Sequence, residues 1–149
     1  MSALPPPLLA LLAEFEGCDR SERAETLIHF ADRFVEVPAE VAARPFPEAH
    51  RVPHCESEAY VWALDRPDGT LDFRFAVENP QGLSAKAWAV VLDETLSGQP
   101  LEAVAAVPGD VVHAVFGREL SMGKGQGLSG MLELVVRAAR RRLAARTPQ

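Results

Sequence analysis

The sequence predicts an α+β fold in which a small antiparallel sheet of about three strands packs against helices from both ends of the chain. Two observations carry this prediction. Apolar residues recur at spacings of three and four near both chain ends, and between these regions two strand-like segments flank a turn. With 149 residues, of which 48% are hydrophobic and 24% charged, the chain is typical of one globular domain spanning residues 1–149.

The N-terminal third predicts two helices followed by a stiff connection. Leu8–Glu16 form the first helix, which a glycine ends. Residues 21–37 form the second, with Ser21 as its N-cap. The apolar face of this helix consists of Leu27, Ile28, Ala31, Phe34 and Val35. Four prolines follow within Pro38–His54, and because each disfavours helical backbone at the residue before it, we expect extended and turn structure there.

The middle of the chain predicts a β-hairpin. The segments "AYVWAL" and "TLDFRFAV" have strand composition, and "DRPDG" between them is rich in turn residues. In the second strand Asp72 and Arg74 alternate with apolar residues, so we expect one face to pack and the other to meet water. The apolar positions of the second strand are Leu71, Phe73, Phe75 and Val77.

The second half of the chain predicts further helices. The pattern over Leu83–Leu96 is helical, and short helices are expected after Pro100 and within "PGDVVHAVFG". "GKGQG", residues 123–127, is expected to be a tight, mobile loop ahead of the last helix. The apolar face of that helix consists of Leu128, Met131, Leu132, Val135 and Ala139, opposite Arg137, Arg140 and Arg141. Both tryptophans are expected in the core.

Charge and cysteine content narrow the function classes. The net charge of −6 argues against general nucleic-acid binding, because an acidic protein repels the phosphate backbone. Residues 121–149 nevertheless carry six basic residues and one acidic residue, a net charge of +5. The N-terminus lacks the basic start of a signal peptide, and no segment approaches the ~18 apolar residues of a membrane span. We therefore expect no membrane association, a cytoplasmic location, and no disulfide between Cys18 and Cys55.

The stretch "HRVPHCESEAY" allows two interpretations of Cys55. A free cysteine is often a small buried residue without chemistry. Here, however, His54 precedes it and Arg51 is close in sequence, whereas Glu56 and Glu58 follow. A thiol on a proline-stiffened loop beside an imidazole and a guanidinium has the means to react as a thiolate, although the glutamates oppose this.

Other chemistry has weaker support in the sequence. His50, His54 and Cys55 could bind a metal, but three donors on one irregular loop fall short of the usual four-ligand spacing. A Cys-His hydrolase would need an oriented base and an oxyanion hole, and no motif marks either. "GKGQG" departs from the phosphate-binding pattern because Lys124 is followed by glycine instead of serine or threonine. Cys18 is expected to be a bystander between the first two helices.

Five motifs in a characteristic order resemble the SufE-like sulfur acceptors of iron–sulfur cluster biogenesis. "EFEGCDRSERAETLIHFADRFVEVP" looks like the opening helices of that family, and "RVPHCES" is similar to its R-V-P-G-C-Q-S element. "DGTLDFRFAV" looks like its second strand, "GLSAKAWAVVLDETLSGQP" like its central helix, and "LSMGKGQGLSGM" like its closing L-S-x-x-R-x-N-G-L-x-x-M motif. The resemblance covers about Leu8 to Arg142 and implies a single domain of SufE/IscU-like fold.

The resemblance also implies a function and a set of site residues. A SufS-like cysteine desulfurase, which depends on pyridoxal phosphate, would pass a persulfide sulfur to Cys55, and Cys55 would hand it to a SufBCD-like iron–sulfur scaffold. The protein would bind no cofactor and would activate its partner instead of acting as a stand-alone enzyme. Besides Cys55, the matching positions that could support transfer or contact the partner are Arg51, His54, Glu56, Ser57, Lys124 and Gln126.

Several of these positions depart from the family pattern. His54 replaces a glycine, Glu56 a glutamine, Lys124 an arginine and Gln126 an asparagine. Loss of the glycine removes backbone freedom, and lysine keeps the charge of arginine without its two-pronged geometry. Two alternatives are therefore kept: a metal- or cluster-binding scaffold of the same fold that uses Cys55 with nearby histidines, and a structural partner protein in which Cys55 is inert.

Overall fold

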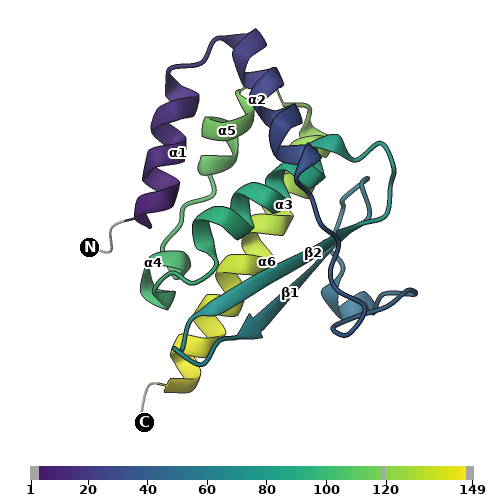
Figure 1. Ribbon diagram of the computed structural model, residues 1–149, viewed down its shortest axis with the longest axis vertical. Coiled ribbons are helices and arrows are strands. Elements are labelled where there is room, and N and C mark those ends of the chain that lie inside the picture. Colours follow the sequence, from purple (N-terminus) through teal and green to yellow (C-terminus); the bar gives the residue numbers. More distant parts are fainter. Residues whose placement is uncertain (1–3, 119, 147–149) are drawn as a thin grey trace.

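The computed structural model describes residues 4–118 and 120–146, which form six α-helices and a two-stranded antiparallel sheet (Figure 1). The predicted α+β class is confirmed. Within these residues no helix combines the length and the apolar character that crossing a membrane requires. The elements in chain order are α1 (Pro6–Glu16), α2 (Arg20–Asp32), the 3-10 turn η1 (Glu48–His50), β1 (Ala59–Asp65), β2 (Leu71–Val77), α3 (Leu83–Leu96), α4 (Leu101–Ala105), α5 (Val111–Phe116) and α6 (Met122–Arg146).

Helix α3 is the centre of the structure. Helices α1 and α2 pack against it, as do β2 and α6, and α6 also packs against β1 (Figure 1). Most of α3 is buried, including Trp88, whose indole N–H donates to Leu128 O at 2.9 Å. The N-terminal helices therefore reach the sheet chiefly through α3, whereas the C-terminal helix contacts the sheet directly.

The hairpin brings the inner face of the sheet into the main core. Its register runs from Ala59 opposite Val77 to Asp65 opposite Leu71. Of the about three strands expected, the described residues form two, since the chain before β1 adds only an isolated bridge between Arg51 and Tyr60. The strand residues buried in the main core are Ala59, Val61, Leu71, Phe73, Phe75 and Val77.

The outer face of the sheet is partly covered, although the sequence predicted that it meets water. The two charged residues of β2 are half-exposed as expected, but Tyr60, Trp62 and Ala76 are buried. They form a second apolar cluster with Val37 and Phe46 from the proline-rich segment after α2. The ring centroid of Phe46 lies 5.2 Å from that of Tyr60 and 5.3 Å from that of Trp62. The proline-rich segment thus folds back over the sheet and gives both faces of β1 an apolar partner.

The N-cap of α2 is Asp19, so the prediction of Ser21 is wrong. The Asp19 side chain accepts a hydrogen bond from Glu22 N at 2.8 Å, and Glu22 Oε1 accepts one from Asp19 N at 3.0 Å. This reciprocal arrangement satisfies two backbone N–H groups at once, which a serine two residues further on could not do.

Helix α2 also ends earlier than predicted. Its last residue is Asp32, and Val35, predicted on the apolar face, is 81% exposed. Beyond the helix the chain becomes extended, and Val37 N–H donates to Phe75 O at 2.8 Å on the edge of β2. Pairing with the sheet edge, together with the proline that follows, outweighs continuation of the helix.

The glycine-rich segment "GKGQG" lies inside α6, so its prediction as a loop is wrong. The predicted apolar face of this helix is confirmed, because all five of its residues are buried. Glycine lowers helix propensity by about 1 kcal/mol relative to alanine, which is why the sequence pattern favoured a loop. The glycines have a packing role instead: a methyl group on Gly127 or Gly130 would lie within 3.1 Å of the segment that carries Cys55.

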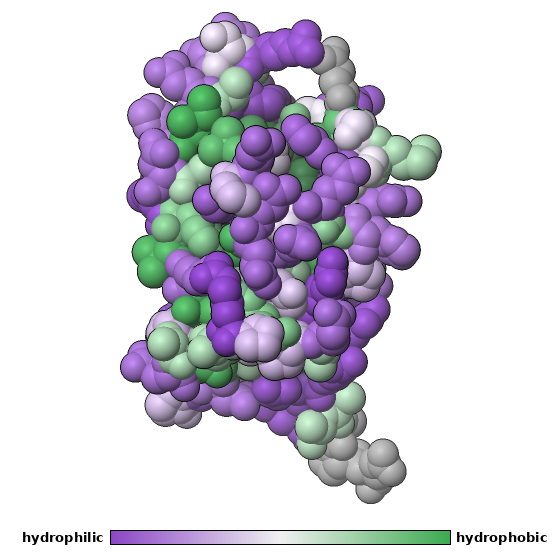
Figure 2. Space-filling model, turned by 90° about the vertical axis from the view of Figure 1, so that its right-hand side faces the viewer, coloured by the Kyte–Doolittle hydropathy of each residue, from purple (hydrophilic) through white to green (hydrophobic). Residues whose placement is uncertain are grey.

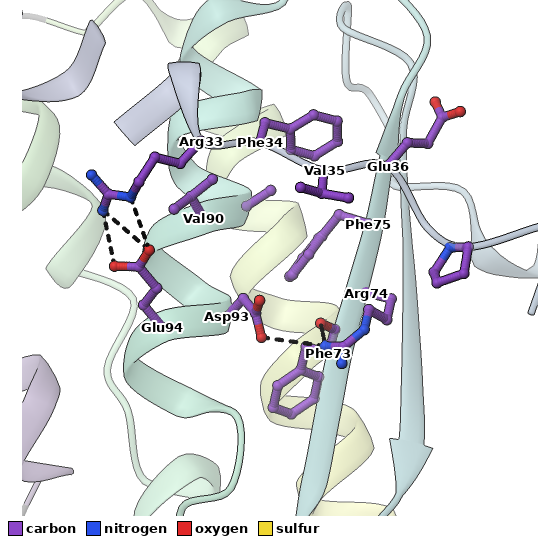
Figure 3. Close-up of a pocket in the computed structure, with 12 residues that line it drawn as sticks. Arg33, Phe34, Val35, Glu36, Phe73, Arg74, Phe75, Val90, Asp93 and Glu94 are labelled. Atoms are coloured by element: carbon purple, nitrogen blue, oxygen red, sulfur yellow. Dashed lines mark hydrogen bonds and ion pairs between the residues drawn. The ribbon is translucent and has the colours of Figure 1, made fainter. Parts of the chain in front are cut away.

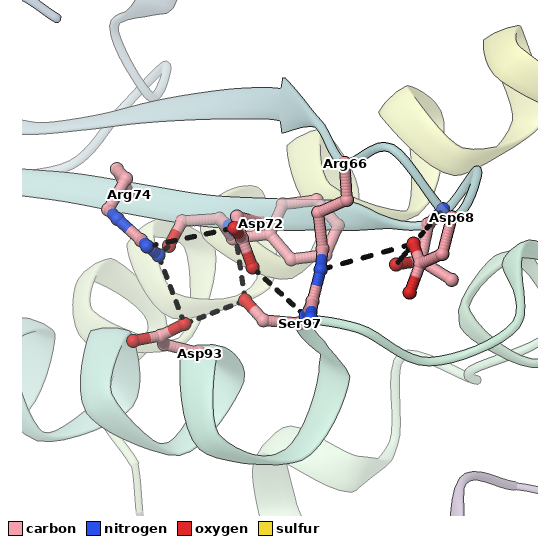
Figure 4. Close-up of polar contacts among 8 residues, drawn as sticks. Arg66, Asp68, Asp72, Arg74, Asp93 and Ser97 are labelled. Atoms are coloured by element: carbon pink, nitrogen blue, oxygen red, sulfur yellow. Dashed lines mark hydrogen bonds and ion pairs between the residues drawn. The ribbon is translucent and has the colours of Figure 1, made fainter.

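The edge of β2 that does not pair with β1 is covered by the C-terminal end of α3 and by the segment after α2. Phe73 N–H donates to Ser97 Oγ at 2.9 Å, and Gly98 N–H donates to Leu71 O at 2.9 Å. The Ser97 hydroxyl in turn donates to Asp93 Oδ1 at 2.6 Å, as part of a polar network that extends to the hairpin turn (Figure 4). An edge closed in this way offers no free strand for aggregation.

We expect Ser97→Ala to lower the free energy of unfolding by about 1–3 kcal/mol, because Phe73 N–H would lose its acceptor in a half-buried position. Urea unfolding of both proteins measures this difference. Ser129→Ala, at an exposed position of α6, is the control and should leave stability unchanged or slightly raised. Equal stability of the wild type and Ser97→Ala would contradict the assignment.

Candidate functional site

Cys55 lies on an irregular segment before β1, residues 52–58, here called the cysteine loop. Val52 N–H donates to Ala59 O at 2.9 Å and closes the base of the loop. Asn79, directly after β2, holds the other side: its backbone N–H donates to Ser57 O at 3.1 Å and its side-chain amide donates to Glu56 O at 3.2 Å. The loop is therefore attached to the hairpin at both ends, although its own residues form no strand.

Two residues of the cysteine loop have left-handed backbone. His54 has φ 57° and Glu58 has φ 52°. Histidine is among the side chains that tolerate this region better than most, but the conformation favours glycine. The position of His54 matches the glycine of the R-V-P-G-C-Q-S element, so the backbone explains why a glycine suits that place.

The cysteine loop packs on the backbone of α6 at successive turns of the helix. A methyl group on Gly127 would lie 3.1 Å from Cys55 Sγ and 3.3 Å from Cys55 Cα. A methyl group on Gly130 would lie 2.8 Å from Val52 Cγ1, and one on Gly123 would lie 3.2 Å from Glu56 Oε1. The three glycines therefore form the face of α6 that receives the loop.

Cys55 is only 9% exposed and borders a hollow of about 280 Å³, here called the Cys55 hollow. The cysteine loop, the connection after β2 and the first turns of α3 and α6 surround it. Its lining residues are Cys55, Glu56, Ser57, Asn79, Gln81, Gly82, Leu83, Ser84, Ala85, Gly123, Lys124, Gly127 and Leu128. The thiol is thus largely sheltered, yet it borders a space large enough for a small ligand.

The predicted site residues fall into three groups. Glu56, Ser57 and Lys124 line the Cys55 hollow together with Cys55. His54 and Gln126 line a neighbouring hollow on the other side of the loop, along α6. Arg51 points elsewhere and forms an ion pair with Glu48 at 3.5 Å. The structure therefore places Lys124 and Glu56 around the same hollow as Cys55, whereas Arg51 lies apart from it.

The metal-site alternative finds no support in the geometry. His50 Nδ1 lies 2.9 Å from Val61 O, and its ring stacks on Trp62 with centroids 5.1 Å apart. His54 lines the hollow beyond the loop, away from the one that Cys55 borders. Across residues 4–118 and 120–146, no three His, Cys, Asp or Glu side chains are grouped so that they could hold a metal ion.

Charged groups with perturbed pKa values lie away from the Cys55 hollow. A hydrogen bond from Arg142 lowers the pKa of Asp65, and hydrogen bonds from Thr70 lower the pKa of Asp68 in the hairpin turn. Burial, followed by the Glu78 carboxylate, raises the pKa of Tyr60 in the outer apolar cluster. These shifts accompany contacts within the hairpin, between the hairpin and α6, and in the outer apolar cluster.

A third hollow, of about 250 Å³, lies between α2, β2 and α3 (Figure 3). Two ion pairs join side chains that line it: Arg33 pairs with Glu94 at 3.0 Å, and Arg74 with Asp93 at 3.4 Å. Glu36, which also lines it, pairs with Arg44 outside the hollow. No cysteine or histidine lines it. The other cysteine, Cys18, is half-buried after α1, where its thiol donates to a backbone carbonyl at 3.3 Å.

The molecular surface beside the proline-rich segment is largely hydrophilic, with apolar side chains gathered toward one margin (Figure 2). Two exposed apolar residues adjoin the Cys55 hollow: Leu83, which lines it and is 48% exposed, and Met122, which is 81% exposed and precedes the lining residue Gly123. Both side chains add apolar surface to the rim of the Cys55 hollow.

Sequence reasoning missed Asn79, Gly82, Ser84 and Gly127 as parts of the site. Asn79 lies in "ENPQG", directly after β2, and residues 78–81 belong to none of the motifs that the sequence offers. The signal for Gly127 was the unfavourable run of glycines in an otherwise helical pattern, since a glycine kept inside a helix often has a packing reason.

One comparison with known proteins identifies a family. The model of the SufE family, described as Fe-S metabolism associated domain, matches residues 10–139. Among solved structures, the solution structure of a hypothetical protein from Thermus thermophilus is 26% identical, with a TM-score of 0.73. That match covers 95% of this chain and 99% of the other. A search of curated proteins gives no match.

We expect Gly127→Ala to displace the cysteine loop, because the new methyl group would lie 3.1 Å from Cys55 Sγ. Overpacking of this kind costs about 1–3 kcal/mol and should offset the gain in helix propensity of about 1 kcal/mol. Alkylation of Cys55 by iodoacetamide should become faster, measured in a Cys18→Ser background so that one thiol reacts. Gly125→Ala is the matched control, since nothing lies within 4 Å of its methyl group. Equal stabilities and alkylation rates for the two variants would refute the packing role of Gly127.

We expect His54→Gly to raise the free energy of unfolding by roughly 0.5–1 kcal/mol. A non-glycine residue in left-handed backbone costs about 1–2 kcal/mol, and part of that gain is lost to the greater freedom of glycine in the unfolded chain. Thermal or urea unfolding measures the change, with His54→Ala as the control that keeps the strain. A destabilised His54→Gly protein would show that the imidazole makes contacts worth more than the strain.

Proposed function

The chain belongs to the SufE family, the Fe-S metabolism associated domain, and on this basis we propose that it is a sulfur-transfer protein that carries persulfide sulfur on Cys55. The donor is a cysteine desulfurase of the SufS-like kind, and the recipient is a SufBCD-like iron–sulfur scaffold. The protein is an acceptor and activator of the desulfurase, not a stand-alone enzyme, and it works in the cytoplasm without a cofactor of its own.

The observation that carries this proposal is the placement of Cys55 on a loop beside a hollow. The thiol is sheltered in the free protein, but beyond the thiol the hollow leaves room for further atoms. The thiolate of Cys55 attacks the terminal sulfur of the desulfurase persulfide. A new sulfur–sulfur bond forms on Cys55, the old one breaks, and the desulfurase cysteine leaves as a thiolate. Such exchange depends on thiolate fraction, nucleophilicity and access.

Access requires the cysteine loop to move. Because Cys55 is only 9% exposed, another protein cannot bring a persulfide into line with the sulfur unless the loop leaves the glycine face of α6. The contacts that hold the loop between its two ends are a few hydrogen bonds and van der Waals contacts, such as the 3.2 Å bond from Asn79 to Glu56 O. Binding of the desulfurase replaces these contacts and extends the loop toward its active site.

The neighbouring residues have distinct proposed roles. Lys124 and Ser57 border the sulfur position, and Lys124 supplies positive charge near a reacting anion. Glu56 balances that charge. His54, Gln126 and Arg51 lie on the surfaces around the loop, where they contact the partner. A complementary arrangement of charges at such a contact favours correct docking of the desulfurase.

Intact-protein mass spectrometry tests the proposal. After incubation with a cysteine desulfurase and free cysteine under non-reducing conditions, we expect the wild type to gain the mass of about one sulfur atom, removable by reductant. Cys55→Ser should gain none, and Cys18→Ser should gain sulfur like the wild type. Normal stimulation of the desulfurase by Cys55→Ser, without sulfur on the wild type, would support the inert structural partner instead.

A further inference from the structure

The outer face of α6 carries a group of arginines in its C-terminal half. Positions three and four residues apart share one face of a helix. Arg140 and Arg141 stand in this relation to Arg137, and all three are exposed. Residues 134–146 contain no acidic residue, although the whole chain has a net charge of −6. An acidic protein therefore presents a concentrated positive charge on one helix face.

This helix face begins beside the cysteine loop. A hollow of about 300 Å³ lies between the two, and here it is called the His54 hollow. The loop contributes Pro53 and His54 to its lining, and α6 contributes residues from Gln126 to Arg137. Arg137 thus belongs both to the hollow and to the group of arginines, so the two form one continuous surface.

The arginines lie within reach of a partner that binds at the cysteine loop. Gly130 lies against the loop, and at a rise of 1.5 Å per residue Arg140 is roughly 15 Å further along α6. An interface of ordinary size buries about 800 Å² on each protein, which spans more than this distance. A protein that binds over the cysteine loop is therefore large enough to cover the arginines as well.

The acidic residues near the group are used by other arginines. Arg137 pairs with Glu133 at 2.8 Å, and Arg142 pairs with Asp65 at 2.7 Å. Across residues 4–118 and 120–146, by contrast, Arg140 and Arg141 take part in no hydrogen bond or ion pair. Their two positive charges are thus available to a negatively charged partner.

Helix stability does not account for these two side chains. A basic residue favours the helix dipole only within the last turn, and in α6 that residue is Arg146. Like charges three and four residues apart repel one another, and this applies to Arg137 with both Arg140 and Arg141. The group therefore lowers the stability of the isolated helix, which points to a role in contact with another molecule.

We propose that Arg137, Arg140 and Arg141, here called the arginine strip, are a docking surface for an acidic surface of the cysteine desulfurase. The inference rests on the proposed function, because it assigns a contact to that partner. Since the rest of the protein is acidic, an acidic partner surface is attracted to the strip and repelled elsewhere. Binding at the strip therefore brings the desulfurase over the adjoining cysteine loop.

Calorimetric titration into the desulfurase tests the proposal without free cysteine, so that no sulfur is transferred. At about 50 mM salt we expect Arg140→Gln/Arg141→Gln to weaken binding roughly three- to tenfold. Raising the salt should weaken binding of the wild type more than that of the variant, because exposed charges are screened. Maximal stimulation of the desulfurase at saturating protein should not change, since neither arginine touches Cys55.

Two variants serve as controls. Arg140→Lys/Arg141→Lys keeps both charges and should bind nearly as well as the wild type. Ala10→Glu/Ala13→Glu lowers the net charge by the same two units at exposed positions of α1, which packs on α3 and α5 away from the cysteine loop (Figure 1). It should bind like the wild type if position matters more than net charge. Circular dichroism checks that each variant is folded.

Equal affinities of the wild type and the glutamine variant at low salt would overturn the proposal, as would equal weakening by the α1 variant. Loss of RNA binding or of binding to anionic vesicles, with desulfurase binding unchanged, would assign the strip to those partners instead. The proposed function fails separately. If the desulfurase binds through the strip but never loads Cys55, the docking surface stands, and if Cys55 is loaded while the variants bind equally, only the docking surface falls.

Discussion

The candidate site depends on the close approach of the cysteine loop to the backbone of α6. A methyl group on Gly127 would lie 3.1 Å from Cys55 Sγ, and one on Gly130 would lie 2.8 Å from Val52 Cγ1. Interiors packed this tightly accept few extra atoms without movement of a neighbour. The glycines lower the intrinsic stability of the first part of α6, and the loop that they receive restores contacts there. The contacts that shelter the Cys55 thiol are therefore the same contacts that pack the cysteine loop on α6.

Helix α3 makes this approach possible by fixing both sides of the site. Its buried length joins the N-terminal helices, the hairpin and α6. Its C-terminal end closes the edge of β2 through Ser97 and Gly98, and its N-terminal end borders the Cys55 hollow. The hairpin edge and the hollow are thus set by opposite ends of one rigid element, which gives the loop a fixed frame against which to move.

Much of this arrangement could be predicted from the sequence, because the signals were local. The range of α3 and the alternation in β2 follow from periodicity, and the prolines before Cys55 indicated an irregular loop. The end of α2 could not be predicted, since it depends on Val37 pairing with Phe75, a contact distant in sequence. The apolar cover of the outer face of the sheet could not be predicted either, because it comes from the proline-rich segment after α2, which folds back over the sheet.

The glycines of α6 show the same limit at the site itself. The low helix propensity of glycine predicted a loop at "GKGQG", but the segment is helical. Only the position of Cys55 in space shows why position 127 is a glycine, since a side chain there would meet the Cys55 sulfur. Glu56 and Ser57, which adjoin Cys55 in sequence, line the Cys55 hollow, as does Lys124, which the resemblance indicated, whereas Arg51 pairs with Glu48. Resemblance to a family supplies positions but not the direction in which each side chain points.

The anchoring of the cysteine loop also determines what its movement requires. The loop is held at its base by the bond from Val52 to Ala59 and at its far side by Asn79, while the ladder between β1 and β2 lies outside it. Release of the loop from α6 therefore breaks these local contacts and takes Val52 and Cys55 out of the main core, whereas the pairing of β1 with β2 stays intact. Local opening of this kind costs less than global unfolding, because few buried apolar contacts are lost. A thiol sheltered by glycine contacts and weakly attached side chains can thus be exposed by a partner without unfolding the domain.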